Sequence, residues 1–456
     1  MAQINKPNLH FNSKLYTGTG AEHAITGVGF QPDWTWIKER STTTSHRVFD
    51  VIRGATVEMF TDLTDAESSD AQSLKTFDSD GFTLGTDGAT NGSSDTYVAW
   101  NWKAAGTAPT KTYTVKVVSD SGNKYRFDDF GTSAVTLELS EGGTYTFDQS
   151  DSSNSGHPLR FSTTSDGTHN SGTEYTTGVT TTGTPGSSGA KTVITVAASA
   201  PTLYYYCSSH SGMGGQANTP TTNSFSDFEG SIQSNVSPNT DAGFSIVSFT
   251  GTAANATVGH GLGVAPACII TKSRANAEDW GFYHQSIGNT GALRLNLTNA
   301  TSTDSAFYNN TSPTTTVFTV GTADATNDAA NMIAYCFAEK KGYSKFGSYT
   351  GNGNADGTFV YTGFKPAFVI IKQTNAVDDW VSYDWKSNEY NQMEKTLRPH
   401  SNAAEISTNR SADFYSNGFK WRSSNGTMNE SGASYIFMAF AEEPLVGTNN
   451  IPATAR

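Results

Sequence analysis

Short apolar runs bounded by turn residues dominate the pattern of hydrophobic and polar positions along the chain. WTWIK (34–38), CIITK (268–272) and FVIIK (368–372) are β-branched or aromatic runs, and a proline precedes each of them. Such runs are typical of strands, whereas the apolar spacing expected of helices is weak throughout. The pattern therefore predicts an all-β chain of short strands joined by turns.

The same series of segments occurs three times. Each unit begins with a proline six positions before a lysine and closes with a nearly continuous apolar run such as YVAWNW (97–102). A continuous apolar run indicates a strand that is covered on both faces. Each unit also has the length of one antiparallel β-sandwich, about 100 residues. We therefore predict three β-sandwich repeats in tandem, marked by the pairs Pro32–Lys38, Pro266–Lys272 and Pro366–Lys372.

A segment between the first and second units does not fit the repeat. VTLELSEGGTYTF (135–147) predicts two strands around a Glu-Gly-Gly turn, and TVITVAASAPTLYYYC (192–207) predicts two more around a proline turn. We therefore expect a separate antiparallel β-sandwich module after the first repeat. The predicted organisation is an N-terminal arm 1–13, a first repeat 14–106, an inserted module 107–221, a linker 222–242, a second repeat 243–342, a third repeat 343–446 and a C-terminal tail 447–456.

Four potential metal ligands occur in the inserted module, in the order His157, Cys207, His210 and Met213. The spacing C-x2-H-x2-M allows one turn to bring three side chains together, whereas the first histidine must come from another strand. Two imidazoles, a thiolate and a weak axial thioether form the ligand set of a blue-copper site. Zinc fits less well, because methionine is a poor ligand for it. Taken singly, these residues would be a buried thiol, loop histidines and a core methionine.

The inserted module resembles the cupredoxin fold. The resemblance rests on the C-x2-H-x2-M motif and on SGHPLRF (155–161), in which the histidine precedes the proline. It implies a sandwich that holds a copper ion between two parts of the chain, with an empty scaffold as the alternative.

Composition excludes several other classes of protein. Only 16% of the residues are charged and the formal net charge is −13, so a phosphate-binding surface for nucleic acid is not expected. The 26 Phe, 19 Tyr and 8 Trp argue against disorder. Three cysteines are too few for a disulfide framework. The N-terminal residues lack an apolar signal segment and no run is long enough for a bilayer, so neither secretion nor membrane insertion is expected.

The repeats resemble an uncharacterised domain of marine bacteriophage virion proteins, which are often tail-associated or fibre-like. The resemblance rests on GFQPDWTWIKERS (29–41), SDTYVAWNWKAAG (94–106) and SGASYIFMAFAEEPLV (431–446). It implies a structural virion protein, such as a tail fibre or appendage, that contacts other virion proteins and a glycan or protein on the host surface. Such a protein would be made in the host cytoplasm, released by lysis, and assembled from several copies of one chain.

Two alternatives remain at this stage. A copper redox protein that transfers electrons would need a signal peptide to reach a periplasmic partner, and none is visible. An enzyme that degrades surface polysaccharide would need two carboxylates across a cleft. The acidic stretch TDLTDAE (61–67) offers carboxylates, but a solvated turn is the simpler interpretation. The sequence therefore favours a protein that is not an enzyme.

Overall fold

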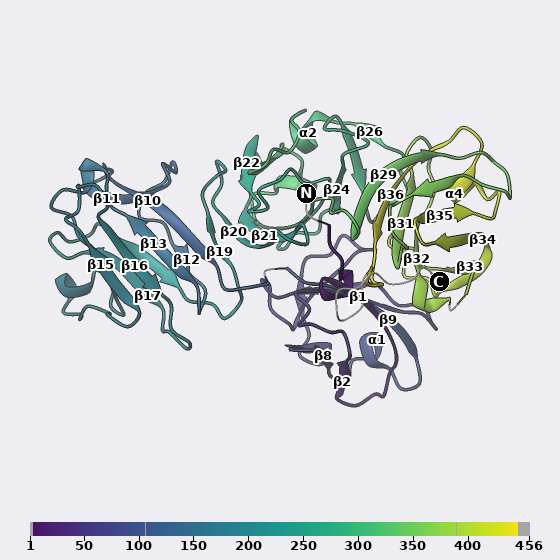
Figure 1. Cartoon of the computed structure of the whole chain (residues 1–456), viewed down its shortest axis with the longest axis horizontal. Helices are drawn as coiled ribbons and strands as arrows, with labels where there is room; N and C mark the ends of the chain where they lie inside the picture. Colours follow the sequence, from purple (N-terminus) through teal and green to yellow (C-terminus); the bar gives the residue numbers. More distant parts are fainter. Residues whose placement is uncertain (1–2, 105, 389, 446–456) are drawn as a thin grey trace.

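The structure, a computed structural model, describes residues 3–104, 106–388 and 390–445. It confirms the predicted all-β class, because antiparallel β-sheets make up nearly all of the regular structure (Figure 1). The C-terminal tail predicted at 447–456 lies outside the described residues.

The first repeat is a sandwich of two sheets with the orders β1-β9-β3-β4-β5-β6 and β2-β8-β7. Apolar residues of both sheets, including Ile37 and Phe82, form one core between them. The elements of this repeat are η1 (Pro7–Leu9), β1 (Phe11–Thr17), β2 (His23–Thr26), β3 (Trp34–Glu39), β4 (Arg47–Asp50), β5 (Val57–Phe60), β6 (Ser68–Ser69), β7 (Leu74–Asp78), β8 (Gly81–Leu84), α1 (Gly88–Asn91) and β9 (Thr96–Trp102).

The second repeat has the sheet orders β19-β20-β21-β28-β23-β24-β25-β26 and β22-β27. Its elements are β19 (Phe225–Asp227), β20 (Ser234–Asn239), β21 (Phe244–Thr250), β22 (Ala256–Gly259), β23 (Cys268–Ser273), β24 (Gly281–His284), β25 (Gly291–Arg294), β26 (Ser302–Thr303), α2 (Ser305–Tyr308), β27 (Val317–Val320), α3 (Asp324–Asn327) and β28 (Asn331–Phe337).

The third repeat has the sheet orders β29-β36-β31-β32 and β30-β35-β34-β33. In all three repeats the closing strand pairs with the first strand on one side and with the strand after the proline on the other, so the repeats share one topology. The elements of the third repeat are β29 (Ser344–Thr350), β30 (Phe359–Tyr361), β31 (Phe368–Gln373), β32 (Trp380–Asp384), η4 (Trp385–Ser387), β33 (Met393–Thr396), β34 (Ile406–Tyr415), β35 (Gly418–Trp421), α4 (Gly426–Asn429) and β36 (Ser434–Phe440).

The prediction of three β-sandwich repeats in tandem implied that each repeat folds as a separate unit. In the structure the three sandwiches instead share a central core. The sheet that holds the closing strand of each repeat turns its second face toward the other two repeats, and one apolar cluster draws residues from all three repeats. At its centre lie the rings of Trp102, Phe337 and Phe440, which hold the same position in the three closing strands. Their centroids are 5.5 to 6.4 Å apart. The repeats therefore surround a pseudo-three-fold axis.

Hydrogen bonds link each repeat to the next around this axis. The indole of Trp280 donates to the Phe60 carbonyl oxygen at 2.8 Å, and the indole of Trp380 donates to the Arg294 carbonyl oxygen at 3.1 Å. The ring of His46, at the same position of the first repeat, lies 3.0 Å from the Arg398 carbonyl oxygen. Because each repeat contacts both others, the three contacts close a ring.

A second ring of contacts runs through main-chain groups at the edges of the repeats. The backbone N–H of Glu405 donates to the Arg40 carbonyl oxygen at 2.9 Å, and Glu67 donates to Arg274 in the same way. At both places the arginine also holds the glutamate with two hydrogen bonds. The third contact, from Thr301 to Thr374, keeps only the main-chain bond. The repeats are therefore fixed both in the core and at the rim.

A buried asparagine holds the same loop in every repeat. Asn91, Asn327 and Asn429 end the short helices before the closing strands and are 0% exposed. Each side-chain oxygen accepts a backbone N–H from the loop after the first strand, and each side-chain nitrogen donates to two carbonyl oxygens. Asn91 accepts from Thr19 and donates to Ala21 and Gly85. Asn327 accepts from Thr252 and donates to Ala254 and Gly321. Asn429 accepts from Asn352 and donates to Asn354 and Ser423.

The lysines that mark the repeats in the sequence are also buried. Lys38, Lys272 and Lys372 are 0% exposed, and the ammonium group of each donates to the carbonyl oxygen of the next residue. Burial, the largest cause, lowers the pKa of each lysine to about 8. Each repeat thus buries an ionisable group at the same position.

The inserted module is a sandwich of two sheets with the orders β11-β10-β13-β16-β15 and β12-β18-β17-β14. Two of its pairings, β10 with β13 and β12 with β18, are parallel, so the module is not purely antiparallel as expected. Its elements are β10 (Thr110–Ser119), β11 (Asn123–Phe127), β12 (Leu137–Glu138), β13 (Thr144–Asp148), η2 (Ser152–Asn154), β14 (Leu159–Ser162), η3 (Gly167–Asn170), β15 (Val179–Thr182), β16 (Lys191–Thr195), β17 (Leu203–Cys207) and β18 (Gly215–Asn218).

The segment 222–242, predicted to be a linker, is part of the folded structure. Its strands β19 and β20 pair with each other, and β20 pairs with β21 of the second repeat. The same segment contacts the inserted module, because Tyr113 donates to the Ser226 carbonyl oxygen at 2.9 Å and Phe228 lies in the core of the module. The prediction was wrong because β19 and β20 are short and polar. This segment joins the module to the repeats (Figure 1).

The predicted N-terminal arm 1–13 is also packed in its described part. The backbone N–H of Ile4 donates to the Lys341 carbonyl oxygen at 3.0 Å, Pro7 is buried, and β1 begins at Phe11. Residues 3–13 therefore connect the first repeat to the loop between the second and third.

Candidate metal centre

Strand pairing explains how two distant parts of the inserted module approach each other. Leu159 on β14 pairs with Cys207 on β17, so His157, two residues before Leu159, lies beside the cysteine. The loop after β17 carries His210 and Met213. The Ser208 backbone N–H donates to the Pro158 carbonyl oxygen at 3.1 Å and continues the contact past the strand ends.

Three of the four predicted ligands meet at this point. The Cys207 Sγ lies 3.8 Å from Nδ1 of His157 and 3.8 Å from Nδ1 of His210. The two imidazole rings have centroids 4.6 Å apart, and one ligand atom from each residue lies within 4.8 Å of the others. With typical bonds of about 2.3 Å to sulfur and about 2.0 Å to nitrogen, a separation of 3.8 Å corresponds to a sulfur–metal–nitrogen angle of roughly 120°. This geometry fits a trigonal His2Cys site.

The fourth predicted ligand, Met213, lies in the module's core. It is 1% exposed and belongs to the same apolar cluster as Cys207. Its carbonyl oxygen accepts the backbone N–H of Tyr125 at 3.0 Å, which fixes the end of the ligand loop against β11.

Polar side chains that the sequence did not single out hold His157 in place. Tyr125 and Gln149 both donate to the His157 carbonyl oxygen at 2.9 Å. The backbone N–H of His157 donates to Asn154, whose side chain is tied to Val115 on β10. Burial, and then the nearby His210, lower the pKa of His157, which favours the neutral imidazole that a metal requires.

The ligand loop is fixed from its other side as well. His169 lies 2.9 Å from the Cys207 carbonyl oxygen, and the Gly212 backbone N–H donates to Asp166 at 2.8 Å. Lys124 also donates to the Gly212 carbonyl oxygen. His169 and Asp166 lie in a stretch rich in Gly, Thr and Ser (165–191), a composition that gives no indication of these contacts. The three ligands are thus held by a preformed network.

Burial decreases across the three ligands. Cys207 is buried, His157 is half-buried and His210 is exposed. A bound ion would therefore lie at the surface of the module, with the thiolate on the inner side and one imidazole toward solvent.

The acidic stretch 61–67 has structural partners. Asp62 accepts the backbone N–H of His46 at 3.0 Å, and Glu67 holds Arg274 of the second repeat. These carboxylates therefore fix loops and join repeats, which differs from the solvated turn expected.

Comparison with protein families places these features in one family. Residues 6–129 and 152–444 match the family described as a domain of unknown function, DUF7483. The chain belongs to the DUF7483 family. The match runs through all three repeats and most of the inserted module.

No curated protein matches this DUF7483 chain, and no solved structure does. Within the described residues, none of the helices has the length and apolar character needed to cross a membrane.

Proposed function

We propose that this DUF7483 chain is a structural protein of a bacteriophage particle, within a tail fibre or similar appendage, and that it is not an enzyme. The observation that carries the proposal is the closed arrangement of the repeats. Trp102, Phe337 and Phe440 meet at one axis, and each repeat bonds to both others. Such a body keeps its shape under load, because moving one repeat would expose the central core.

The assignment to a phage rests on the resemblance carried by the repeat sequences. On this proposal the chain is made in the host cytoplasm and released by lysis. Its partners are other virion proteins and a glycan or protein of the host surface. Association of several copies stays a prediction, which light scattering tests against the 48.6 kDa mass of one chain.

Purified particles test the proposal. Mass spectrometry of the phage that encodes this chain, banded by density, should find the chain at a fixed ratio to the major structural proteins. A whole-particle reconstruction should show three sandwiches around an axis with a fourth to one side. A chain that is abundant in the lysate and absent from banded particles would contradict the proposal.

A second role is favoured by the ligand geometry of the inserted module. We infer that His157, Cys207 and His210 hold a copper ion, with Met213, which belongs to the same apolar cluster as Cys207, as the candidate for a weak axial ligand. The observation is the pair of 3.8 Å sulfur–nitrogen distances, which suits a trigonal site. Bound to the folded state, copper would stabilise the module by linking the end of β17 to the chain before β14. The module's own residues position the two imidazoles and shield the thiolate from solvent.

Spectroscopy of the full chain tests this second role. Addition of Cu(II) to the wild type should produce an intense visible absorption from thiolate-to-copper charge transfer, with saturation at one ion per chain. Cys207→Ser should abolish the band, whereas His23→Ala, which removes a histidine of the first repeat, should leave it unchanged. A Cys207→Ser chain with the same band would exclude the site.

A further inference from the structure

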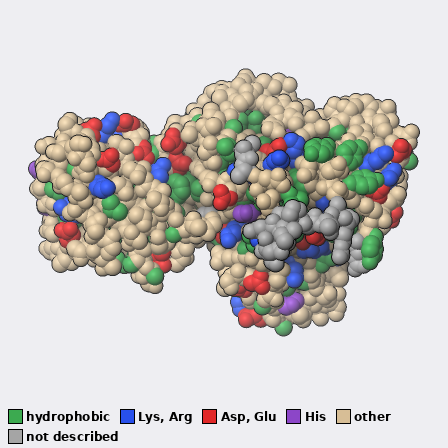
Figure 2. Space-filling view, viewed as in Figure 1, with side chains coloured by type: hydrophobic (Ala, Val, Ile, Leu, Met, Phe, Trp, Pro, Cys, Tyr) green, Lys and Arg blue, Asp and Glu red, His purple; other side chains and the backbone are tan. Residues whose placement is uncertain are grey.

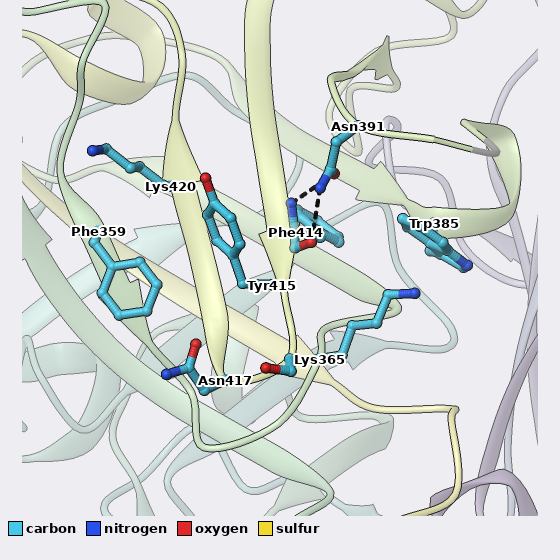
Figure 3. Close-up of a pocket in the computed structure, with 9 residues that line it drawn as sticks. Phe359, Lys365, Trp385, Asn391, Phe414, Tyr415, Asn417 and Lys420 are labelled. Atoms are coloured by element: carbon cyan, nitrogen blue, oxygen red, sulfur yellow. Dashed lines mark hydrogen bonds between the residues drawn. The ribbon is translucent and has the colours of Figure 1, made fainter. Parts of the chain in front are cut away.

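The third repeat has an open hollow, lined by residues of β30, β34 and β35 and by residues before β31 and after β32 (Figure 3). Its volume is about 670 Å³. Phe359 and Tyr415 lie on one side of it, and Lys365 and Trp385 lie on the other. The hollow is therefore lined by aromatic rings and by lysines, in a chain whose net charge is −13.

Large apolar side chains are exposed at the edge of this hollow. Phe359 is 44% exposed and Tyr361 is 64% exposed, and both belong to β30, an edge strand. Exposed aromatic residues on an edge strand invite association and are normally avoided. Figure 2 shows one face of the molecule, where hydrophobic side chains gather together with basic and acidic ones over the third repeat.

The other two repeats show that these aromatic residues are not needed for the fold. Val360, which lies between Phe359 and Tyr361, pairs with Phe419. The equivalent buried pairs are Ile25 with Phe82 in the first repeat and Val258 with Phe318 in the second. The positions on either side of Ile25 and Val258 hold small or polar residues. Phe359 corresponds to Ala24 and Thr257, and Tyr361 corresponds to Thr26 and Gly259.

The basic and aromatic residues across the hollow are also peculiar to the third repeat. Lys365 precedes the repeat's proline, where the other repeats have Gln31 and Ala265, and Trp385 replaces Val51 and Gln285. The Lys365 ammonium lies 3.3 Å from the centroid of the Trp385 ring, a cation–π contact that holds the charge at the wall of the hollow.

The two charged residues that line the hollow, Lys365 and Lys420, are both basic, and no acidic residue lines it among the described residues. Outside the lining, Lys420 pairs with Asp356 at 2.6 Å, and that carboxylate is 73% exposed. An exposed pair of this kind is weak, so an anionic ligand can compete for the ammonium group. Asn391 is occupied by two hydrogen bonds with the Phe414 backbone, which leaves Asn417 and Ser416 as the polar groups at the edge (Figure 3).

We infer that this hollow binds an acidic glycan. Sugar rings stack their C–H faces on exposed aromatic rings such as Phe359, which lines the hollow, and Tyr361, two residues further along the same strand. Lys365 and Lys420 attract a carboxylate or sulfate on the sugar, and Asn417 can bond its hydroxyl groups. The inference deepens the proposed contact with a host surface and rests on it for its biological meaning.

Calorimetric titration of the full chain tests the inference. The probes are oligosaccharides of alginate and polygalacturonate, which carry carboxylates, of carrageenan, which carries sulfates, and of neutral laminarin. At least one acidic probe should bind, and laminarin should bind about tenfold more weakly or not at all. Comparison of the acidic probes distinguishes carboxylate from sulfate as the recognised group.

The repeats supply variants that retain the fold. Phe359→Ala with Tyr361→Thr, and separately Lys365→Gln, install the residues of the first repeat, and each should weaken binding of the acidic probe about tenfold. Val377→Ala, at a 72% exposed position of the same repeat outside the hollow, is the control and should change nothing. Far-UV circular dichroism should be the same for all variants.

Three results would overturn the inference: no binding of any acidic probe, equal binding of laminarin, or full binding by the hollow variants. These outcomes are separate from the test on particles. Failure here with the chain present on particles refutes only this site, whereas glycan binding with the chain absent from particles refutes only the virion role.

Discussion

The indole of Trp100 in the first repeat donates a hydrogen bond to the Asp384 carboxylate of the third repeat, at 2.8 Å. The equivalent aromatic residue of the second repeat, Tyr335, donates to Asp50 of the first at 2.7 Å. His284, which corresponds to the two aspartates, lies 3.1 Å from the Phe437 carbonyl oxygen of the third repeat. The three contacts run in one direction around the axis, so polar pairing as well as apolar packing closes the body.

Trp100→Phe should destabilise the chain in a pH-dependent way. Burial raises the pKa of Asp384 to about 6, and loss of the indole donor should raise it further. A carboxyl group whose pKa is higher in the folded chain than in the unfolded chain contributes stability that is lost as the pH rises from about 4 through the folded pKa. The loss of unfolding free energy caused by Trp100→Phe should therefore grow between pH 5 and pH 8. At pH 8 we expect about 1–3 kcal/mol by urea unfolding.

Trp102→Phe is the matched control for that change. Its ring lies in the same core, and its indole nitrogen has no hydrogen-bond partner among the described residues. This variant should lose packing only, so the decrease in its free energy of unfolding should be independent of pH. Equal pH profiles for the two variants would contradict the role given to the Trp100–Asp384 bond.

The buried asparagines should matter equally in the three repeats. Asn91→Ala, Asn327→Ala and Asn429→Ala each remove three hydrogen bonds and leave buried backbone groups without partners. We expect each to lower the free energy of unfolding by about 3 kcal/mol. The exposed Asn255→Ala should stay within about 0.5 kcal/mol of the wild type. A negligible effect in any one repeat would show that its loop is held by other contacts.

The buried lysines should make the chain more stable as the pH rises above neutrality. With a pKa of about 8 in the folded chain and about 10.4 when unfolded, the unfolded state binds more protons in this interval. Stability should then increase by up to about 1.4 kcal/mol per pH unit for each lysine. Because buried cysteines and tyrosines, whose pKa is raised, oppose this trend, the lysine contribution is measured as a difference in slope between the wild type and a lysine variant from pH 8 to 9.

Lys372→Met should reduce that slope by one lysine's share, whereas the exposed Lys191→Met should leave it unchanged. Equal slopes for Lys372→Met and the wild type would mean that Lys372 keeps its charge in the folded chain.

Copper should raise the melting temperature of the wild type and leave Cys207→Ser unaffected. The reason is that an ion bound only by the folded module shifts the equilibrium toward it. Calorimetry of the full chain with Cu(II) and with a chelator measures the shift. Equal melting temperatures for the wild type in both conditions would exclude a stabilising role for the metal.

The sequence predicted the strands of the repeats well and their packing only in part. The closing run YVAWNW indicated a strand covered on both faces, and β9 is such a strand. Tyr97 and Ala99 face the core of the first sandwich, whereas Trp100 and Trp102 face the central core. The pattern could not show that the second cover is two other copies of the same repeat, because apolar residues do not specify their partners.

The metal centre, like the repeats, could be predicted from the sequence only in part. The sequence predicted that Cys207 and His210 lie together and that His157 joins them from another strand, and the pairing of β14 with β17 brings His157 to Cys207. Tyr125, Gln149 and Asn154 were missed, since a polar residue's partner depends on the fold. The buried asparagines left one usable signal, an asparagine shortly before the closing strand in every unit, from which no role was inferred.

Hydrogen exchange with mass spectrometry tests the central claim, that three repeats form one closed body, most directly. If β9, β28 and β36 are covered by a shared core, their slowest amides should exchange through the same global opening, with one free energy and one denaturant dependence. Trp102→Ala in the first repeat should then speed exchange in all three strands. Three distinct free energies, with the effect of Trp102→Ala confined to β9, would contradict the account.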